Sequence, residues 1–224
     1  MSLGLCDVPF DRALSDREAE RPVTLLAAVR DGERILIAAD GSRSRSDRAS
    51  GASGTDVAAK LRQVGDLPMV WGYRGDEDDG EPVALELEDH PPADCQLALS
   101  TIADHVRRSN VKMIRGVKDP AADTRDKLEV LAAGLVDGGL TLGHIDWWGN
   151  WTPMSDACFV GNGWVSGYAA WDAASKVDSS GDVEQRLRVT MAALVMHVGI
   201  LGPPLSFRAL GSEPPYVTVL RESA

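Results

Sequence analysis

Two apolar runs joined by a tight turn constrain the fold of this chain more than any other feature. Residues 23–30 (VTLLAAVR) and 34–39 (RILIAA) are rich in residues that favour β-strands, and the Asp31-Gly32 pair between them is typical of a hairpin turn. Neither run alternates between apolar and polar residues, so both faces of the strands must be covered. The sequence therefore predicts an antiparallel hairpin inside a layered domain.

Composition and charge narrow the class of protein. The chain has 224 residues, of which 44% are hydrophobic, and this is enough to form the core of one domain. Its formal charge of −11 argues against a nucleic-acid or anionic-membrane partner, because both require a positive surface. The sequence contains no apolar run long enough for a membrane span, and the charged residues within 7–21 argue against a secretory signal. We therefore expect a cytoplasmic protein.

The cysteines and histidines are dispersed along the sequence. Cys6, Cys95 and Cys158 form no CxxC pair, and the four histidines are equally isolated from one another. Metal sites and disulfide frameworks usually show closely spaced ligands or paired cysteines. We therefore expect no metal and no cofactor, with Cys158 as a small buried hydrophobe.

Periodicity predicts the remaining elements. We expect strands at 57–64, 69–73, 128–136, 140–146, 156–160, 206–210 and 216–220, and helices at 94–108, 164–174 and 182–198. Residues 41–56 are rich in Gly, Ser and Arg, and residues 76–92 are acidic and contain proline, so both are expected to be loops. Hairpins dominate this order, which indicates antiparallel sheets covered by helical layers. Residues 1–22 are expected to form a polar leader or arm ahead of a domain at 23–224.

Several local motifs, taken in order, resemble one family. Residues 24–40 (TLLAAVRDGERILIAAD) resemble an opening hairpin that runs from a nucleophilic threonine to an aspartate 16 positions later. Further matches are Lys60 in AAKLRQV, WGYRGD at 71–76, DGG at 137–139, HID at 144–146 and FVGNG at 159–163. On these motifs the chain resembles the N-terminal nucleophile hydrolases, and specifically the proteasome β-subunit group that includes the Anbu proteins. The resemblance implies an α+β fold, a four-layer αββα sandwich with two antiparallel sheets.

The resemblance also implies a set of site residues. In this family a threonine hydroxyl attacks an amide, and the threonine's own free α-amino group is the base. A lysine keeps that amine neutral, a carboxylate orients the lysine, and a glycine N–H stabilises the oxyanion. The residues that match these roles are Thr24, Asp40, Lys60 and Gly72. Each also has a structural interpretation, as a strand residue, a turn carboxylate, a solvated or ion-paired lysine and a glycine that permits close strand packing.

The sequence departs from the family pattern around these residues. Asn162 stands at a usual serine, Val198 and Leu201 at a usual aspartate and serine, Ser42 at a frequent arginine, and Val23 at the usual glycine before the nucleophile. While Val23 is joined to Thr24, the Thr24 nitrogen is an amide and cannot act as a base. We therefore expect a proteasome-like structural or binding subunit without peptidase activity in its unprocessed form. The alternative is a latent threonine hydrolase of peptides or other amides, activated by cleavage before Thr24.

Copies of the same chain are the expected partners. The family forms rings, stacked rings or helical assemblies, so the resemblance implies a homo-oligomer, with a peptide or small amide as possible ligand. Three tryptophans within 147–151 suit either loop packing or a subunit contact. Three arginines within 43–48 are either solvated, bound to a carboxylate or phosphate, or paired with the acidic 76–89 segment of a neighbour.

Overall fold

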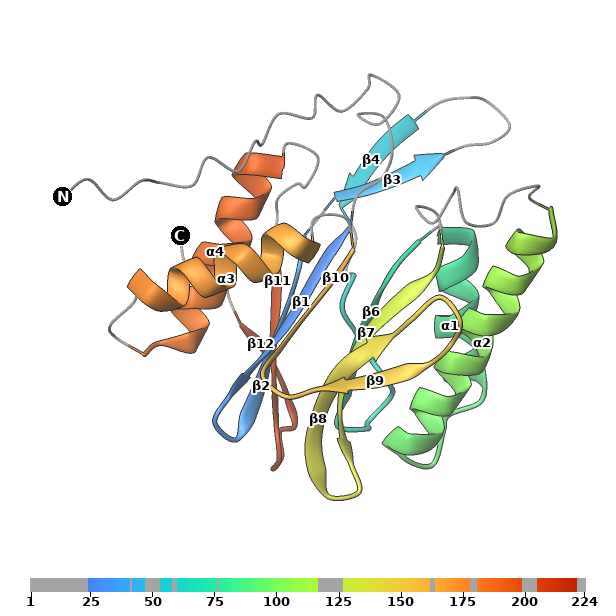
Figure 1. The fold of residues 1–224 in the computed structure, drawn as a ribbon. Coiled ribbons are helices and arrows are strands. Elements are labelled where there is room, and N and C mark those ends of the chain that lie inside the picture. The colour runs from blue at the N-terminus through green and yellow to red at the C-terminus, as the bar shows by residue number, and fades with distance from the viewer. Residues whose placement is uncertain are drawn as a thin grey trace.

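The computed structural model describes residues 24–40, 42–46, 53–57, 60–75, 77–116, 127–161, 164–177, 181–198 and 205–220. Over these residues two helices, two five-stranded sheets and two further helices form four successive layers (Figure 1). Every strand pair is antiparallel. The predicted α+β class and αββα sandwich are therefore confirmed, whereas the expected leader at 1–22 lies outside the described residues.

The first sheet contains the predicted opening hairpin. Its order is β10 (Ala157–Gly161), β1 (Leu25–Asp31), β2 (Arg34–Ala39), β11 (Ser206–Gly211) and β12 (Val217–Leu220). Gly32 has a φ of 59° in the β1–β2 turn, a conformation that favours glycine. Leu25 and Ala27 face the helices α3 (Trp164–Val177) and α4 (Val183–Val198), while Leu26 and Ala28 face the second sheet. Both faces of β1 are buried, which explains the absence of alternation in its sequence.

The second sheet packs face to face on the first. Its order is β5 (Arg62–Gln63), β6 (Met69–Arg74), β7 (Glu129–Val136), β8 (Gly139–Ile145) and β9 (Trp151–Met154). Asp137 and Gly138 both have positive φ in the β7–β8 turn, at 52° and 77°, as a type I′ hairpin turn requires. Leu131 and Leu142 lie in the apolar layer between the two sheets. This layer is the central core of the domain.

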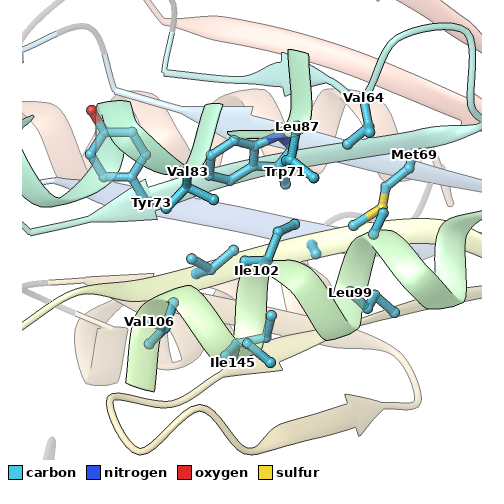
Figure 2. Packing of buried hydrophobic residues seen from close by; sticks show 14 of the residues in the cluster. Val64, Met69, Trp71, Tyr73, Val83, Leu87, Leu99, Ile102, Val106 and Ile145 are labelled. Carbon is cyan, nitrogen blue, oxygen red and sulfur yellow. The ribbon is translucent and has the colours of Figure 1, made fainter. Parts of the chain in front are cut away.

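Two helices cover the outer face of each sheet. Helices α3 (Trp164–Val177) and α4 (Val183–Val198) lie on the first sheet, and α1 (Glu77–Asp89) and α2 (Cys95–Gly116) lie on the second (Figure 1). Figure 2 shows Val83 of α1 and Ile102 of α2 packed with Trp71 of β6. Asp94 caps α2, since its Oδ1 accepts a hydrogen bond of 2.7 Å from the Leu97 N–H. None of the described helices is long and apolar enough to cross a membrane.

The prediction of a loop at 76–92 was wrong, because α1 occupies most of it. Acidic residues and Pro82 concealed a short apolar stripe at Val83, Ala84 and Leu87, all of which are buried against α2 and the second sheet. Tertiary packing of this stripe outweighs the weak local propensity. Gly80 permits the close packing of α1 on Tyr73, because a Cβ there would lie 2.1 Å from the Tyr73 ring.

Three further expectations are corrected. Residues 41–56 were expected to be a loop, but they contain β3 (Ser42–Ser46) and most of β4 (Ser53–Val57), which pair as a separate two-stranded sheet. Main-chain pairing needs no apolar side chain, so hydropathy does not detect it. Of the strand expected at 57–64, only the two residues of β5 form a strand of the second sheet. Strand β9 was not predicted.

Candidate functional site

The β1–β2 hairpin brings Thr24 and Asp40 to the same end of the first sheet. Thr24 directly precedes β1 and Asp40 directly follows β2, so the antiparallel register places them side by side. The Leu25 N–H donates a 2.8 Å hydrogen bond to Asp40 Oδ1, and the Asp40 N–H donates a 3.1 Å bond to the Leu25 carbonyl. Asp40 is completely buried. Its carboxylate is therefore held in one orientation by the start of β1.

Lys60 joins these two residues from the segment before β5. Its Nζ donates hydrogen bonds of 2.8 Å to Asp40 Oδ1 and 3.2 Å to Thr24 Oγ1, and the side chain is only 6% exposed. The structure thus brings together three of the four residues singled out from the sequence. An ammonium directed at a hydroxyl oxygen stabilises negative charge that develops there, and the carboxylate holds the ammonium in place. Their catalytic role stays a prediction.

Gly72 lies beside this cluster on β6. A Cβ at this position would lie 2.9 Å from the Lys60 carbonyl oxygen and 3.0 Å from Leu26 Cδ2. The absence of a side chain therefore lets β6 lie close to the backbone of Lys60. This supports the structural interpretation of Gly72 as a glycine that permits close packing. Its expected oxyanion role remains a prediction.

Substituting Gly72 tests this close approach. Gly72→Ala should lower the free energy of unfolding by about 1–3 kcal/mol, because the added methyl group must displace backbone at Lys60. Urea denaturation measures the effect. Gly134→Ala on β7 is a matched strand control, since its Cβ would meet only side-chain atoms at 3.4 Å or beyond. Equal stability of the two variants would contradict the assignment.

Gly161, at the end of β10, is a site-positioning residue that the sequence analysis did not single out. It pairs with Leu25 across the β1–β10 ladder and has a φ of 114°. A Cβ at this position would lie 1.8 Å from the Thr24 carbonyl oxygen, so only glycine allows the present backbone of Thr24. Its place in the small-residue motif at 159–163 was the available signal.

A cleft of about 430 Å³ opens beside Gly161, between β10 and the second sheet. One wall carries Arg74, Glu129 and His144, which lie on neighbouring strands of the second sheet. Arg74 Nη1 donates a 2.7 Å bond to Glu129 Oε2, and His144 Nε2 lies 3.8 Å from Glu129 Oε1. The register places all three on the face of Leu131, which is directed at the first sheet. We call these residues the ion row.

Aromatic side chains form much of the remaining lining. Trp147, Trp164 and Tyr168 line the cleft, and the Lys127 Nζ lies 3.5 Å from the centroid of the Trp147 ring. Cys158 also lines it, but burial raises the pKa of its thiol to about 12, so the thiol stays protonated and a weak nucleophile. Cys158 is 2% exposed, which confirms the prediction of a buried hydrophobe.

The lowered pKa of the Glu129 carboxylate predicts that the stability of the fold depends on pH. Burial alone would raise its pKa, but the contacts with His144 and Arg74 outweigh burial and hold the pKa below its ordinary value. A carboxylate with a lowered pKa in the folded state stabilises at neutral pH, and this stabilisation is lost as the pH falls through the folded pKa.

Glu129→Gln should therefore destabilise the chain at neutral pH and have a smaller effect at about pH 3. Urea denaturation at both pH values measures this. Asp172→Asn is a control on an exposed helix pair with Lys176. A destabilisation by Glu129→Gln that does not change between the two pH values would contradict the expectation.

Several residues that the sequence predictions include, by name or within a named group, lie outside the described parts of the chain. These are Cys6, Val23, Arg48, Asn162 and Leu201, together with the side chains of Ser42, Arg43, Arg45, His197 and Val198. The tryptophans at 147–151 lie in different environments: Trp151 packs on the core, whereas Trp148 is 49% exposed. Among the described residues, no group of three or more His, Cys, Asp or Glu side chains could hold a metal ion.

The layers, the opening hairpin and the position of Thr24 at its first strand define a proteasome-like αββα sandwich. Among solved structures, the chain is similar to Anbu (ancestral beta-subunit) from Yersinia bercovieri, with a TM-score of 0.63 and 16% sequence identity over 88% of each chain. No family model and no curated protein matches the sequence. The predicted resemblance to the proteasome β-subunit group and Anbu is therefore confirmed at the level of the fold.

Proposed function

We propose that this proteasome-like chain is a latent threonine-type hydrolase of peptide or other amide bonds. It is inert while Val23 is joined to Thr24 and becomes competent when cleavage releases the Thr24 amine. The observation that supports this best is the buried Lys60 Nζ, which contacts both Thr24 Oγ1 at 3.2 Å and Asp40 Oδ1 at 2.8 Å. A lysine that only stabilised Asp40 would need no contact with the hydroxyl.

The proposed reaction uses the contacts of Lys60 with Thr24 and Asp40. In the released chain the α-amino group of Thr24 takes the hydroxyl proton, and Oγ1 forms a bond to the amide carbon. The tetrahedral intermediate then breaks its C–N bond, and the amine leaves with the proton from the α-amino group. Water hydrolyses the resulting ester and regenerates the hydroxyl. Lys60 disfavours protonation of the nearby α-amino group and stabilises charge on Oγ1.

Release of Thr24 is the event to test. The full-length chain is incubated and its intact mass followed, and a second sample is cleaved before Thr24 through an introduced protease site. We expect a threonine-directed electrophile to label the chain that begins at Thr24 and to leave the full-length chain unlabelled. Thr24→Ser should retain labelling, and Thr24→Ala should abolish it. No labelling of a folded chain that begins at Thr24 would overturn the proposal and favour a structural or binding subunit.

We also propose that the chain acts as a cytoplasmic homo-oligomer. Apolar side chains on α3 and α4 support this, since Trp164, Val165 and Met196 are 53%, 61% and 81% exposed. A charge of −11 per chain opposes association unless charged faces avoid the contact or find basic partners. Sedimentation at low and high salt should show a dimer or a larger assembly. A monomer at micromolar concentration in both conditions would contradict it.

A further inference from the structure

The segment that carries Lys60 leads into a very short edge strand. Strand β5 begins two residues after Lys60, lies at the edge of the second sheet, and pairs with β6 through two residue pairs. A ladder of this length supplies few main-chain hydrogen bonds. The Lys60 side chain nevertheless occupies one buried position, with Nζ in contact with both Thr24 and Asp40. Contacts other than this ladder must therefore help to hold the segment in place.

Glu81 of α1 supplies such a contact on the outer face of the second sheet. Its Oε1 accepts a hydrogen bond from Arg62 Nη2 on β5 and a 3.3 Å hydrogen bond from the Tyr73 hydroxyl on β6. One carboxylate oxygen thus joins the two strands. The side chains of Arg62 and Glu81 are 24% and 31% exposed, so their ion pair is partly shielded from water and is stronger than a fully exposed pair.

This contact lies at the level of Lys60. Tyr73 directly follows Gly72 on β6, and successive side chains of a strand point to opposite faces. Tyr73 lies beneath α1 (Figure 2), whereas the Cβ position of Gly72 is 2.9 Å from the Lys60 carbonyl oxygen. Gly80 brings α1 close at this point, since a Cβ there would lie 2.1 Å from the Tyr73 ring. Glu81 therefore holds, from the outer face, the part of β6 that contacts Lys60 on the inner face.

We infer that Glu81 is a positioning residue for Lys60: by tying β5 to β6 beneath α1, it holds the Lys60 ammonium between Asp40 and Thr24. Glu81 acts through its hydrogen-bond partners on the two strands. The inference rests on the proposed function and deepens it, because it names a residue of the helical layer that sets the geometry of the site.

Acetylation of the full-length chain measures the position of Lys60 without catalysis. The folded chain is treated with acetic anhydride, and mass mapping gives the modification rate of each lysine. Lys60 and Lys127 are 6% and 1% exposed, so both should react slowly, whereas the Lys176 side chain is 72% exposed and should react fast. Glu81→Ala should raise the Lys60 rate at least about tenfold relative to Lys127, because it loosens β5 locally. An unchanged ratio, or an equal rise at both lysines, would overturn the inference.

Glu86→Ala is the matched control on the same helix. The Glu86 carboxylate contacts His105 and Arg108 of α2, so its loss weakens the docking of α1 but leaves the contact with β5 in place. The ratio of the Lys60 and Lys127 rates should stay unchanged in this variant. An equal rise in the Glu81 and Glu86 variants would mean that Lys60 depends on α1 as a whole, and would overturn the role of Glu81.

Arg62→Met removes the same ion pair from the side of β5, and it carries the test if Glu81→Ala does not fold. It should raise the Lys60 rate as Glu81→Ala does, and the double variant should show no further rise, since both substitutions break one contact. Glu81→Gln keeps an oxygen acceptor and should restore part of the protection. Unaltered protection of Lys60 in Arg62→Met, or additive effects in the double variant, would overturn the inference.

Activity gives an independent measurement in the chain that begins at Thr24. Glu81→Ala should lower kcat about tenfold and leave KM unchanged, because Lys60 acts at Thr24 Oγ1 and not on the bound substrate. A raised KM with an unchanged kcat would contradict the positioning role.

The two proposals fail in different ways. The acetylation measurement uses the full-length chain, so it does not depend on release of Thr24. Labelling of the processed chain with an unchanged ratio of the Lys60 and Lys127 rates would overturn this inference and leave the hydrolase in place. A raised ratio without labelling would overturn the hydrolase and leave Glu81 as the residue that positions Lys60.

Discussion

Lys60→Met in a chain that begins at Thr24 is expected to lower amide hydrolysis by roughly 10²–10⁴-fold, as the loss of one charge-stabilising or proton-transfer group commonly does. The ammonium that contacts Thr24 Oγ1 at 3.2 Å is lost, while a side chain of similar volume remains. Initial rates on a peptide anilide measure the effect. Activity within a factor of two of the unsubstituted chain would contradict the role of Lys60.

The same substitution should also destabilise the full-length chain, by about 3–5 kcal/mol, because it removes the ammonium that lies 2.8 Å from the buried Asp40 carboxylate. Urea denaturation measures this. Lys176→Met is the control, since Lys176 pairs with Asp172 on an exposed helix face and its loss should change stability by less than about 0.5 kcal/mol.

The double variant Asp40→Asn with Lys60→Met separates stability from chemistry. An asparagine Oδ1 can still accept the Leu25 N–H, and no uncompensated charge remains, so part of the lost stability should return. Hydrolysis should not return with it. Recovery of both would mean that the pair affects activity only through folding.

Gly161→Ala should be the most damaging single methyl addition near the site. The added Cβ would lie 1.8 Å from the Thr24 carbonyl oxygen, and a φ of 114° is strained for alanine. Together these effects should lower the free energy of unfolding by roughly 2–6 kcal/mol, and the β1–β10 ladder must shift at Leu25.

Gly181→Ala is the matched control for this change. Gly181 has a φ of 73°, but nothing lies within 4 Å of its Cβ position, so this variant measures backbone strain alone. Thermal and urea unfolding of both variants isolates the contact with Thr24. Equal destabilisation by the two substitutions would mean that Gly161 does not position Thr24.

Turn chemistry and continuous apolar runs made much of the sandwich predictable. The Asp-Gly pairs at 31–32 and 137–138 specify two of its hairpins through local backbone preferences alone. The even apolar character of β1 and β2 indicated burial on both faces, and both faces are buried. Helix α1 was missed, because its short apolar stripe has meaning only when Tyr73 and Trp71 of β6 lie beneath it.

The sequence by itself determined which residues could form the site, through the separation of Thr24 and Asp40 along a hairpin and the likeness around Lys60 and Gly72. Only the tertiary structure decided that Lys60 Nζ contacts both Asp40 and Thr24. It alone identified Gly161 and the cleft at the edge of β10. The physical reason is range: hairpin turns and strand periodicity act between neighbours in the chain. The buried ion pair joins Asp40 and Lys60, which lie next to strands of different sheets, and the close approach of Gly161 to Thr24 joins segments more than a hundred residues apart.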